Sequence, residues 1–582
     1  MNKIHRIVWS AVRGAFVVAH EMANSHGKPS STQHASRQPN SFPFKGKAGM
    51  GMGQIRPIAL ALALCLATAV LPAPTFAAPP VNALPTNGQI VGGAAAGTIN
   101  TAGSAMTIQQ NQQRMIANWD TFNIGQSASV HFAQPGGGVA LNRVNGGQPS
   151  EIFGKLTATG AVYLLNSAGV LFGRSAQVDV GALVASTGKL SDADFLANKI
   201  RIAQQGSGGK ILNEGQLKAA VDGYIALLAP EVRNQGVIFA EKGTVALAAG
   251  EAYELQFEGT RLANVRVQPG EFAALVENGN AVEAPGGLII LSAHAVTRLQ
   301  GAAIKNNGIL DASSLTMKGG RIVLEASGSI ENTGTLKVSR GPGQAAGSIE
   351  ISAPQVVLNG SIALQGQQGG QLHAQASESL AVGARIDASG IDLGGNVVLE
   401  AARSTGITGS IAATASEGAG GEITVAAGQD LTLANASLTA EGATHGGRIR
   451  LKAEPSVVAS LLDPANPLND PTAPGTPTQV AITGNTTLST RSRGKGGQID
   501  LTGDNLLLGS GTQLDASGET GGGLVQVGGG WQGSGGLYQA TTVTMEHGAL
   551  INVSATKVGA GGTAVLWANL DKPDSLDRKS VV

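Results

Sequence analysis

The stretch GGEITVAAGQDLTLANASLTAEG, residues 420–442, decides the fold. It contains three short runs in which apolar residues occupy every second position: Ile423 and Val425, Leu431 and Leu433, and Leu438 and Ala440. Alternation with period two is typical of β-strands that are buried on one side. Gly, Asn and Asp separate the runs, and these residues favour tight turns. We therefore expect three short strands, joined by turns, within this stretch.

The same pattern returns along the C-terminal half, and each copy opens on Gly-Gly. The clearest copies are GGLIILSA (286–293), GGRIVLEA (319–326), GGQLHAQA (369–376), GGNVVLEA (394–401), GGRIRLKA (446–453), GGQIDLTG (496–503) and GGTAVLWA (561–568). Neighbouring copies after Gly369 lie 25 or 26 residues apart, with one gap of 50. Propeller blades need about 40 residues per repeat. Three strands in so short a repeat instead predict an all-β fold, a right-handed parallel β-helix, with about 11 coils over residues 286–571.

Composition and charge agree with a solenoid. Glycine accounts for 84 of 582 residues, and charged residues for only 13%. The net charge of zero is a cancellation, because residues 1–77 contain eight Lys or Arg and one Glu, which leaves 31 basic and 38 acidic residues in the remainder. An acidic body of low charge argues against nucleic acid as a partner, since Lys and Arg supply most of that affinity.

The first 77 residues are predicted to be a leader. Residues 58–71 (IALALALCLATAVL) form an uncharged apolar run that is shorter than the roughly 20 residues of a membrane span and suits a signal-peptide core. We expect cleavage after Ala77, which also removes Cys65, the single cysteine. Residues 1–23 carry apolar residues near helical spacing, interleaved with basic ones, and they resemble the extended signal-peptide region of large Gram-negative exoproteins.

A family resemblance rests on three segments of the N-terminal half. They are IANWDTFNIGQSASVHFAQP (116–135), ALNRVNGGQ (140–148) and AVYLLNSAGVLFGRSAQVDVGALVASTGK (161–189). Together they resemble the N-terminal secretion domain of the filamentous-haemagglutinin-like exoproteins of two-partner secretion. The resemblance implies that residues 78–285 form a capped β-helical secretion domain. It also implies a partner, a dedicated outer-membrane transporter of the Omp85 superfamily.

The family signature Asn-Pro-Asn-Gly-Ile/Val maps onto residues 166–170, where Ser167 and Ala168 replace the Pro and the second Asn. A second family motif, Asn-Pro-Asn-Leu, has no clear copy. The resemblance implies a transporter-recognition set of Asn142, Arg143, Asn166, Gly169 and Val170. An alternative is that Asn166 only forms a turn between the flanking strands.

Residues 286–568 are predicted to be the repeat region, interrupted by a loop at 454–477 that contains six prolines. Proline cannot donate to a strand ladder, so this segment is expected to be extruded. Residues 569–582 have no strand pattern. Because members of the resembled family usually continue the repeat, we expect this tail to mark a truncated reading frame.

No catalytic pattern emerges from the sequence. The histidines after the leader, His131, His294, His373, His445 and His547, are far apart and lack metal-ligand spacing. Asp192 and Asp194 could be imagined as an acid–base pair, but Ser191 before them predicts the N-cap of a short helix. We therefore expect no enzyme activity, cofactor or metal.

These observations predict a secreted adhesin or haemagglutinin-type exoprotein, a non-catalytic and monomeric binding rod that reaches the cell surface through the periplasm and outer membrane. Its receptor is expected on host cells, matrix or other bacteria. Two alternatives stay open: a truncated stalk of a contact-dependent inhibition or toxin exoprotein, and a secreted protease. A further hypothesis concerns export, in which the chain crosses the periplasm unfolded and each emerging coil folds onto the previous one.

Overall fold

The computed structural model describes residues 5–10, 15–20, 78–204, 208–296, 302–314, 319–457 and 477–569. The chain divides into two units, residues 1–73 and 74–582. In the first unit β1 (His5–Ser10) and β2 (Ala15–His20) pair antiparallel. Strands therefore stand where the apolar spacing suggested a helix, in keeping with the strand preference of the Ile and Val residues there.

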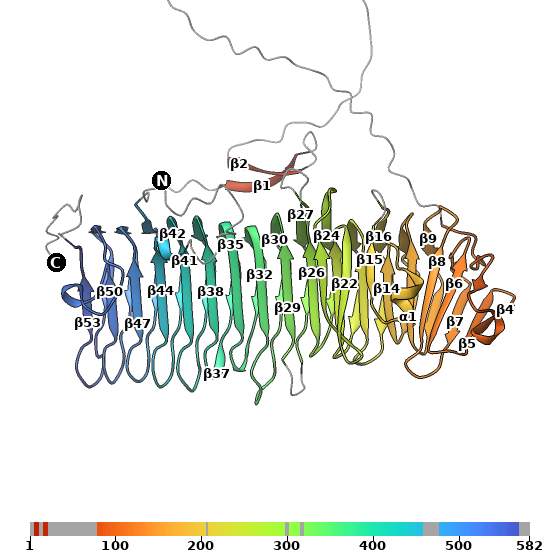
Figure 1. Ribbon diagram of the computed structural model, residues 1–582. Helices are drawn as coiled ribbons and strands as arrows, with labels where there is room; N and C mark the ends of the chain where they lie inside the picture. The colour runs from red at the N-terminus through yellow and green to blue at the C-terminus, as the bar shows by residue number, and fades with distance from the viewer. Residues whose placement is uncertain are drawn as a thin grey trace, which may run out of the picture. The chain divides into compact units, whose positions relative to one another are not determined.

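The second unit is a parallel β-helix, which confirms the predicted fold class (Figure 1). Each coil contributes one strand to each of three ladders, which we call ladders 1, 2 and 3 in the order in which the chain visits them. Within each ladder, every strand pairs in parallel with its counterpart one coil away. Stacking thus satisfies the backbone groups that a single coil leaves unpaired.

Ladder 1 holds the longest strands and opens each coil. Its strands are β6 (Arg114–Trp119), β8 (Val139–Val144), β11 (Ala161–Asn166), β14 (Ala182–Ser186), β18 (Tyr224–Leu228), β21 (Thr244–Ala249), β26 (Leu288–Ala293), β29 (Arg321–Ala326), β32 (Ser348–Leu358), β35 (Gln371–Val382), β38 (Asn396–Ala401), β41 (Glu422–Ala427), β44 (Arg448–Ala453), β47 (Gln498–Thr502), β50 (Leu524–Val527) and β53 (Thr563–Leu566).

Ladder 2 follows across a short corner. The C-terminal halves of β32 and β35 belong to it, and its other strands are β9 (Ser150–Ile152), β12 (Val170–Phe172), β16 (Lys210–Asn213), β19 (Glu231–Asn234), β24 (Ala274–Asn278), β27 (Ala302–Asn306), β30 (Ser329–Asn332), β39 (Ser404–Ile407), β42 (Asp430–Ala434), β45 (Gln479–Thr483), β48 (Asn505–Leu508) and β51 (Thr542–Met545).

Ladder 3 closes each coil. Its strands are β5 (Ala105–Gln110), β7 (Ser129–Ala133), β10 (Lys155–Ala158), β13 (Gln177–Val180), β17 (Gln216–Ala219), β20 (Val237–Ala240), β25 (Ala281–Glu283), β28 (Ile309–Asp311), β31 (Thr335–Lys337), β33 (Ser361–Ala363), β36 (Arg385–Asp387), β40 (Ser410–Ala412), β43 (Ser437–Thr439), β46 (Thr487–Ser489), β49 (Gln513–Asp515) and β52 (Leu550–Asn552). Beside it, β34 (Gly366–Gln368) and β37 (Gly390–Leu393) pair in the turns that lead to the next coil.

The open N-terminal edge of the β-helix is capped. β4 (Gly97–Ala102) pairs antiparallel with β5, and β3 (Gln89–Ile90) pairs antiparallel with β6. A short 3-10 helix, Gly93–Ala95, joins β3 and β4. The cap covers strand edges that would otherwise invite pairing with another chain.

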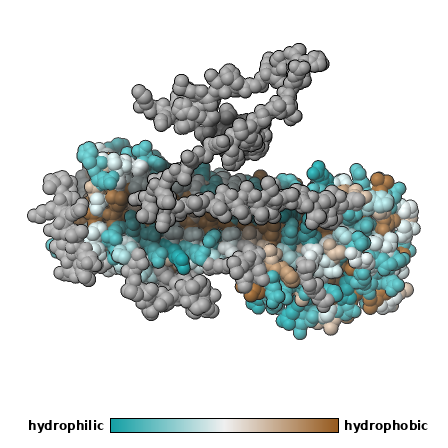
Figure 2. Space-filling view, turned by 90° about the horizontal axis from the view of Figure 1, so that it is seen from above, coloured by the Kyte–Doolittle hydropathy of each residue, from teal (hydrophilic) through white to brown (hydrophobic). Residues whose placement is uncertain are grey.

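The core is a stack of aliphatic side chains that point inward. In the deciding stretch, all six residues of the alternating runs are fully buried: Ile423, Val425, Leu431, Leu433, Leu438 and Ala440. The outward positions between them are half-buried or exposed. Polar residues accordingly cover most of the visible surface of this unit in Figure 2, where apolar residues form small separate patches.

The number of coils in the repeat region differs from the sequence-based expectation of about 11. From β26 onward, the described residues form nine complete coils and the first strand of a tenth. The period is regular only between β32 and β44, and insertions lengthen other coils. The strand spacing of about 4.8 Å per coil therefore spans fewer coils than the residue count suggested.

The longest insertion lies where the proline-rich loop was predicted, although residues 458–476 are outside the described residues. Ala427 pairs with Ala453, and Asp430 pairs with Gln479. Two residues separate the strands in the first coil, whereas 25 separate them in the second. The ladder continues in register on both sides of this insertion. No helix among the described residues is long and apolar enough to cross a membrane.

Candidate functional site

The residues proposed for transporter recognition lie on two neighbouring coils of the secretion domain. Asn142 is on β8, and its side chain is fully buried. Its Oδ1 accepts a hydrogen bond from Trp119 Nε1 over 3.0 Å, and its Nδ2 donates to the carbonyl oxygens of Ala140 and Tyr163 over 3.3 Å. In the folded domain Asn142 is therefore a core residue that satisfies an indole N–H.

Arg143 points the other way and holds down a segment that lies outside the coils. Its Nη2 donates to the carbonyl oxygen of Leu190 over 2.7 Å, and its Nη1 lies 2.5 Å from Asp192 Oδ1. Asp192 begins α1 (Asp192–Leu196), and Ser191 caps this helix by accepting from the Asp194 amide over 3.0 Å. This confirms the predicted short helix. Arg143 is thus a positioning residue for α1.

Asn166, Gly169 and Val170 form one turn between β11 and β12. Asn166 is buried, and its Nδ2 donates to the carbonyl oxygen of Gln148 and to Ser150 Oγ, over 2.9 and 3.0 Å. Gly169 has a φ of 119°, and a Cβ there would lie 2.8 Å from the Lys210 carbonyl oxygen, so only glycine fits. Val170 is buried in the core.

The structure therefore brings the five residues together, because β8 and β11 are paired and Val144 lies beside Asn166. Only Arg143 among them has a side chain that is partly exposed and points out of the coil. Ala77, the predicted cleavage position, lies outside the described residues.

A second apolar core, which sequence reasoning missed, covers ladder 1 in the same region. Two excursions from the corner between ladders 1 and 2 build a cover from α1, β15 (Arg201–Ala203), β22 (Ala252–Glu258) and β23 (Arg261–Gln268). Its buried residues include Leu190, Phe195, Ile202, Tyr253 and Val265, which pack against outward-pointing residues of ladder 1.

The sequence does carry a signal for this cover. Every residue of β11, β14, β18 and β21 is buried, so these strands are apolar on both sides. Continuous apolar runs, as opposed to alternating ones, mark strands that are covered on both faces. The runs AVYLL, ALVA, YIALL and VALAA in the printed sequence differ in this way from the alternating RIVLEA of the repeats.

Aromatic and basic side chains join the cover to ladder 1. The hydroxyl groups of Tyr163 and Tyr224 lie 2.7 Å apart in the buried layer. Burial raises the pKa of Tyr163 to about 12, and burial together with the neighbouring Tyr163 raises the pKa of Tyr224 well above its usual value. Arg114 stacks over the ring of Phe195, with 5.0 Å to its centroid, and donates to the Phe195 carbonyl oxygen over 2.7 Å.

A different feature marks the repeat region, a groove of about 1160 Å³ that runs across the coils from β35 to β53. Its floor consists of the Gly-Gly pairs. A Cβ on Gly420 would lie 2.2 Å from the Ala440 carbonyl oxygen, and one on Gly421 would lie 2.1 Å from the Gly395 carbonyl oxygen. Close approach of the coils on both sides thus explains why both positions of the motif are glycine.

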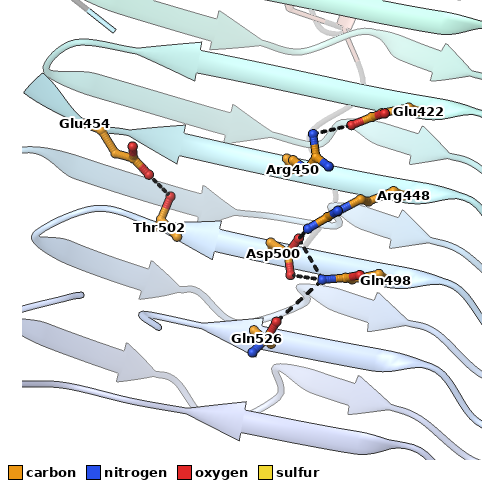
Figure 3. A network of polar contacts seen from close by, with 8 residues as sticks. All are labelled: Glu422, Arg448, Arg450, Glu454, Gln498, Asp500, Thr502 and Gln526. Atoms are coloured by element: carbon orange, nitrogen blue, oxygen red, sulfur yellow. Dashed lines mark hydrogen bonds and ion pairs between the residues drawn. The ribbon is translucent and has the colours of Figure 1, made fainter. Parts of the chain in front are cut away.

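One wall of the groove is made by the first residues of successive ladder 1 strands, which include Gln371, Asn396, Glu422, Arg448 and Gln498. The opposite wall includes Gln368, Leu393, His445 and Lys495. The first wall continues into a polar network on the outer surface of ladder 1 (Figure 3).

In this network Asp500 is almost fully buried and receives Arg448 Nε and Nη2 over 2.9 and 2.6 Å. Gln498 Nε2 also donates to Asp500, over 2.8 Å. One coil further towards the N-terminus, Arg450 Nη1 lies 2.5 Å from Glu422 Oε1. The charges along this wall are therefore neutralised by partners within the protein.

Comparison with known proteins identifies both ends of the export machinery in this chain. The family model of the TPS secretion domain matches residues 78–338, and that of the extended signal peptide of type V secretion systems matches residues 1–48. The chain belongs to the two-partner secretion exoproteins. It is exported through the periplasm and across the outer membrane to the cell surface, and its secretion domain implies a cognate outer-membrane transporter as partner.

Two curated relatives are heme/hemopexin-binding proteins of Haemophilus influenzae. The protein of strain KW20 Rd is 32% identical over 253 residues, which is 42% of this chain and 27% of the relative. The second is 29% identical over 248 residues, which is 39% of this chain and 26% of the relative. The chain thus matches about a quarter of the length of these relatives.

Two solved structures are also similar to this chain. The HMW1 secretion domain from Haemophilus influenzae has a TM-score of 0.41 and 20% identity, over 82% of this chain and 100% of that one. The filamentous hemagglutinin secretion domain has a TM-score of 0.25 and 16% identity, over 50% of this chain and 94% of that one.

Proposed function

We propose that this exoprotein is an adhesin or haemagglutinin-type protein, a non-catalytic, monomeric rod that binds a receptor on host cells, matrix or other bacteria. The observation that carries the proposal is the contrast between the two sides of ladder 1. Directly after the Gly-Gly pair, the outward residue changes from Arg321 to Gln371, Glu422 and Leu524. The next, inward residue is always aliphatic, as in Ile322, Leu372, Ile423 and Val525. A constant core with a varied surface suits a scaffold that presents binding groups.

The corner between ladders 1 and 2 supports the same proposal. The cover, the insertion after Ala453 and residues 528–541 all leave the coils at this corner. The last of these carries Trp531, which is 65% exposed. Exposed Trp residues frequently act as anchors in protein interfaces, and loops on a rigid scaffold are the usual carriers of binding function.

For export, we propose that an Omp85-superfamily transporter meets the recognition residues before the domain folds. Asn142, Asn166 and Val170 are buried in the folded coils, so a transporter reaches their side chains only in the unfolded chain. Folding outside the cell then buries them and retains the exported segment, because each coil adds to the edge of the previous one.

A binding assay with the secreted chain tests the proposal. Purified mature protein, residues 78–582, is expected to coat host cells or extracellular matrix at a level well above that of an unrelated β-helix, and to run as a monomer in light scattering. Binding no stronger than that of the unrelated β-helix contradicts the adhesin function and favours the alternative of a stalk. Turnover of a peptide or casein substrate by the same preparation favours the protease alternative.

A further inference from the structure

The groove of the repeat region has a recognisable chemistry, and we propose that it binds an extended, neutral polysaccharide strand along the coils. This inference rests on the proposed binding function and assigns one surface to it. The argument depends on the floor, the free amides of the wall and the balance of charge.

The floor offers no backbone groups for pairing with a peptide strand. The second glycine of each pair donates its N–H within its own coil and accepts from the next coil. Gly421 N donates to the Ala413 carbonyl oxygen over 2.7 Å, and its carbonyl oxygen accepts from Arg448 N over 2.9 Å. Gly447 repeats this arrangement with Ala440 and Gln498, over 2.7 and 3.0 Å. A ligand is therefore recognised by the side chains of the walls and not by strand addition.

The wall supplies amides that the protein itself does not use. Gln371 and Asn396 are exposed, and within the described part of the chain their side chains make no hydrogen bonds that the structure shows. Each amide provides two donors and an acceptor, which matches the paired donor and acceptor character of a hydroxyl group. Because they start successive strands of one ladder, they are spaced by about 4.8 Å.

The charges of the wall are already paired. Arg448 binds the buried Asp500, and Glu422 binds Arg450. The groove extends from β35 to β53, six coil steps, or roughly 29 Å at the usual strand spacing. A long, open groove that is rich in amides and poor in unpaired charge fits a hydroxyl-rich polymer without charge, held by weak contacts that repeat along its length.

Direct binding tests this proposal. The probes are cellohexaose, chitohexaose, maltohexaose and β-1,4-galactohexaose, with a heparin hexasaccharide as the acidic comparison, measured by calorimetry on the mature chain. We expect at least one neutral hexasaccharide to bind, its disaccharide to bind at least tenfold more weakly, and 0.5 M salt to change the affinity by less than twofold. Binding by none of the neutral probes, or by heparin alone with loss at high salt, overturns the proposal.

Two matched variants locate the site. Asn396→Trp fills the groove, whereas Thr432→Trp places the same ring on an exposed strand position of ladder 2 in the next coil. We expect Asn396→Trp to weaken binding at least tenfold and Thr432→Trp to change it less than twofold, with equal thermal stability. The double variant Gln371→Ala and Asn396→Ala removes the amides without adding bulk and is expected to weaken binding about tenfold.

The results separate the groove from the general function. Equal affinity of wild type and Asn396→Trp overturns the groove site, even if the chain still coats cells, because adhesion then uses another surface. Failure of the wild-type chain to coat any cell or matrix, with hexasaccharide binding intact, contradicts the proposed adhesion and leaves the groove as a glycan site.

Discussion

At the scale of single residues, the Gly-Gly pair sets how closely two coils approach. The first glycine faces a carbonyl oxygen of the following coil, and the second faces one of the preceding coil, as Gly420 and Gly421 show. Neither position has a positive φ, so close approach, and not turn conformation, demands glycine here. The motif is therefore a packing requirement of the β-helix and also the reason that its groove is bare.

We expect Gly421→Ala to lower the free energy of unfolding by about 2 kcal/mol or more, because its Cβ would overlap a backbone oxygen that cannot move aside. Gly406 is the matched control. It lies in β39, where the nearest atom to an added Cβ is Thr432 Oγ1 at 3.5 Å. Gly406→Ala is expected to be neutral or to stabilise by up to ~1 kcal/mol, since glycine weakens strands. Urea unfolding of both variants measures this, and equal midpoints would contradict the packing argument.

A second residue-scale prediction concerns two buried threonines. Thr490 Oγ1 is buried without a hydrogen-bond partner, whereas Thr486 Oγ1 donates to the Thr483 carbonyl oxygen over 2.7 Å. Both residues are fully buried. Thr490→Val should therefore raise the free energy of unfolding by about 1 kcal/mol, and Thr486→Val should lower it by about 1 kcal/mol. Denaturant midpoints that move in the same direction for both variants would disprove the assignment.

At the scale of elements, a ladder of asparagines runs inside five successive coils. Asn213, Asn234, Asn278, Asn306 and Asn332 are all fully buried at the ends of ladder 2 strands. Each Nδ2 donates to the next Oδ1 over 2.7 or 2.8 Å. In the next coil Leu358 takes this position. The secretion-domain coils thus carry a polar register mark that the later coils lack.

Interior and end positions of this ladder should differ. Asn278→Leu leaves the neighbours on both sides without a partner, whereas Asn332→Leu affects one neighbour and extends the aliphatic stack that begins at Leu358. We expect Asn278→Leu to destabilise by about 2 kcal/mol more than Asn332→Leu, because each unpaired buried amide group costs about 1–3 kcal/mol. Equal losses in thermal or urea unfolding would mean that the hydrogen bonds between amides contribute little.

The cover should be sensitive to alkaline pH through Tyr163 and Tyr224. Burial raises the pKa of Tyr163 to about 12 from an unfolded value near 10. The folded state therefore favours the protonated phenols, and this contribution to stability is fully present below pH 10 and is lost as the pH rises from 10 towards 12. Tyr163→Phe with Tyr224→Phe should flatten this loss in urea unfolding, and an unchanged slope would contradict the linkage.

At the scale of the whole molecule, long insertions of the described chain leave the coils at one corner, between ladders 1 and 2. The cover uses this corner in the secretion domain, and the insertions after Ala453 and Val527 use it in the repeats. The turns at the Gly-Gly corner stay short and form the groove. One edge of the β-helix is thereby specialised for excursions and another for a continuous surface.

Coil-by-coil folding outside the cell predicts that a cross-link made before export blocks it. Thr424 and Arg450 are partners in adjacent strands of ladder 1, at a spacing of about 4.8 Å that a disulfide can bridge. Cysteines at both positions should form a bond in the oxidising periplasm and reduce secretion severalfold, with recovery when a reductant is added. Single-cysteine variants are the controls. Secretion of the cross-linked chain at the wild-type level would contradict transport of an unfolded chain.

Local pattern was enough to predict the strands and their stacking. The alternation of Ile423 with Val425 and of Leu431 with Leu433 reports a strand with one buried side, and its return after every 25 or 26 residues reports a coil. These features involve neighbours in sequence, so they are legible without coordinates. Contacts between distant residues decided the rest. Arg114 meets Phe195, 81 residues away, and Tyr163 meets Tyr224, 61 residues away, so the cover, the burial of Asn142 and Asn166, and the groove over the glycines arise only when the coils are stacked.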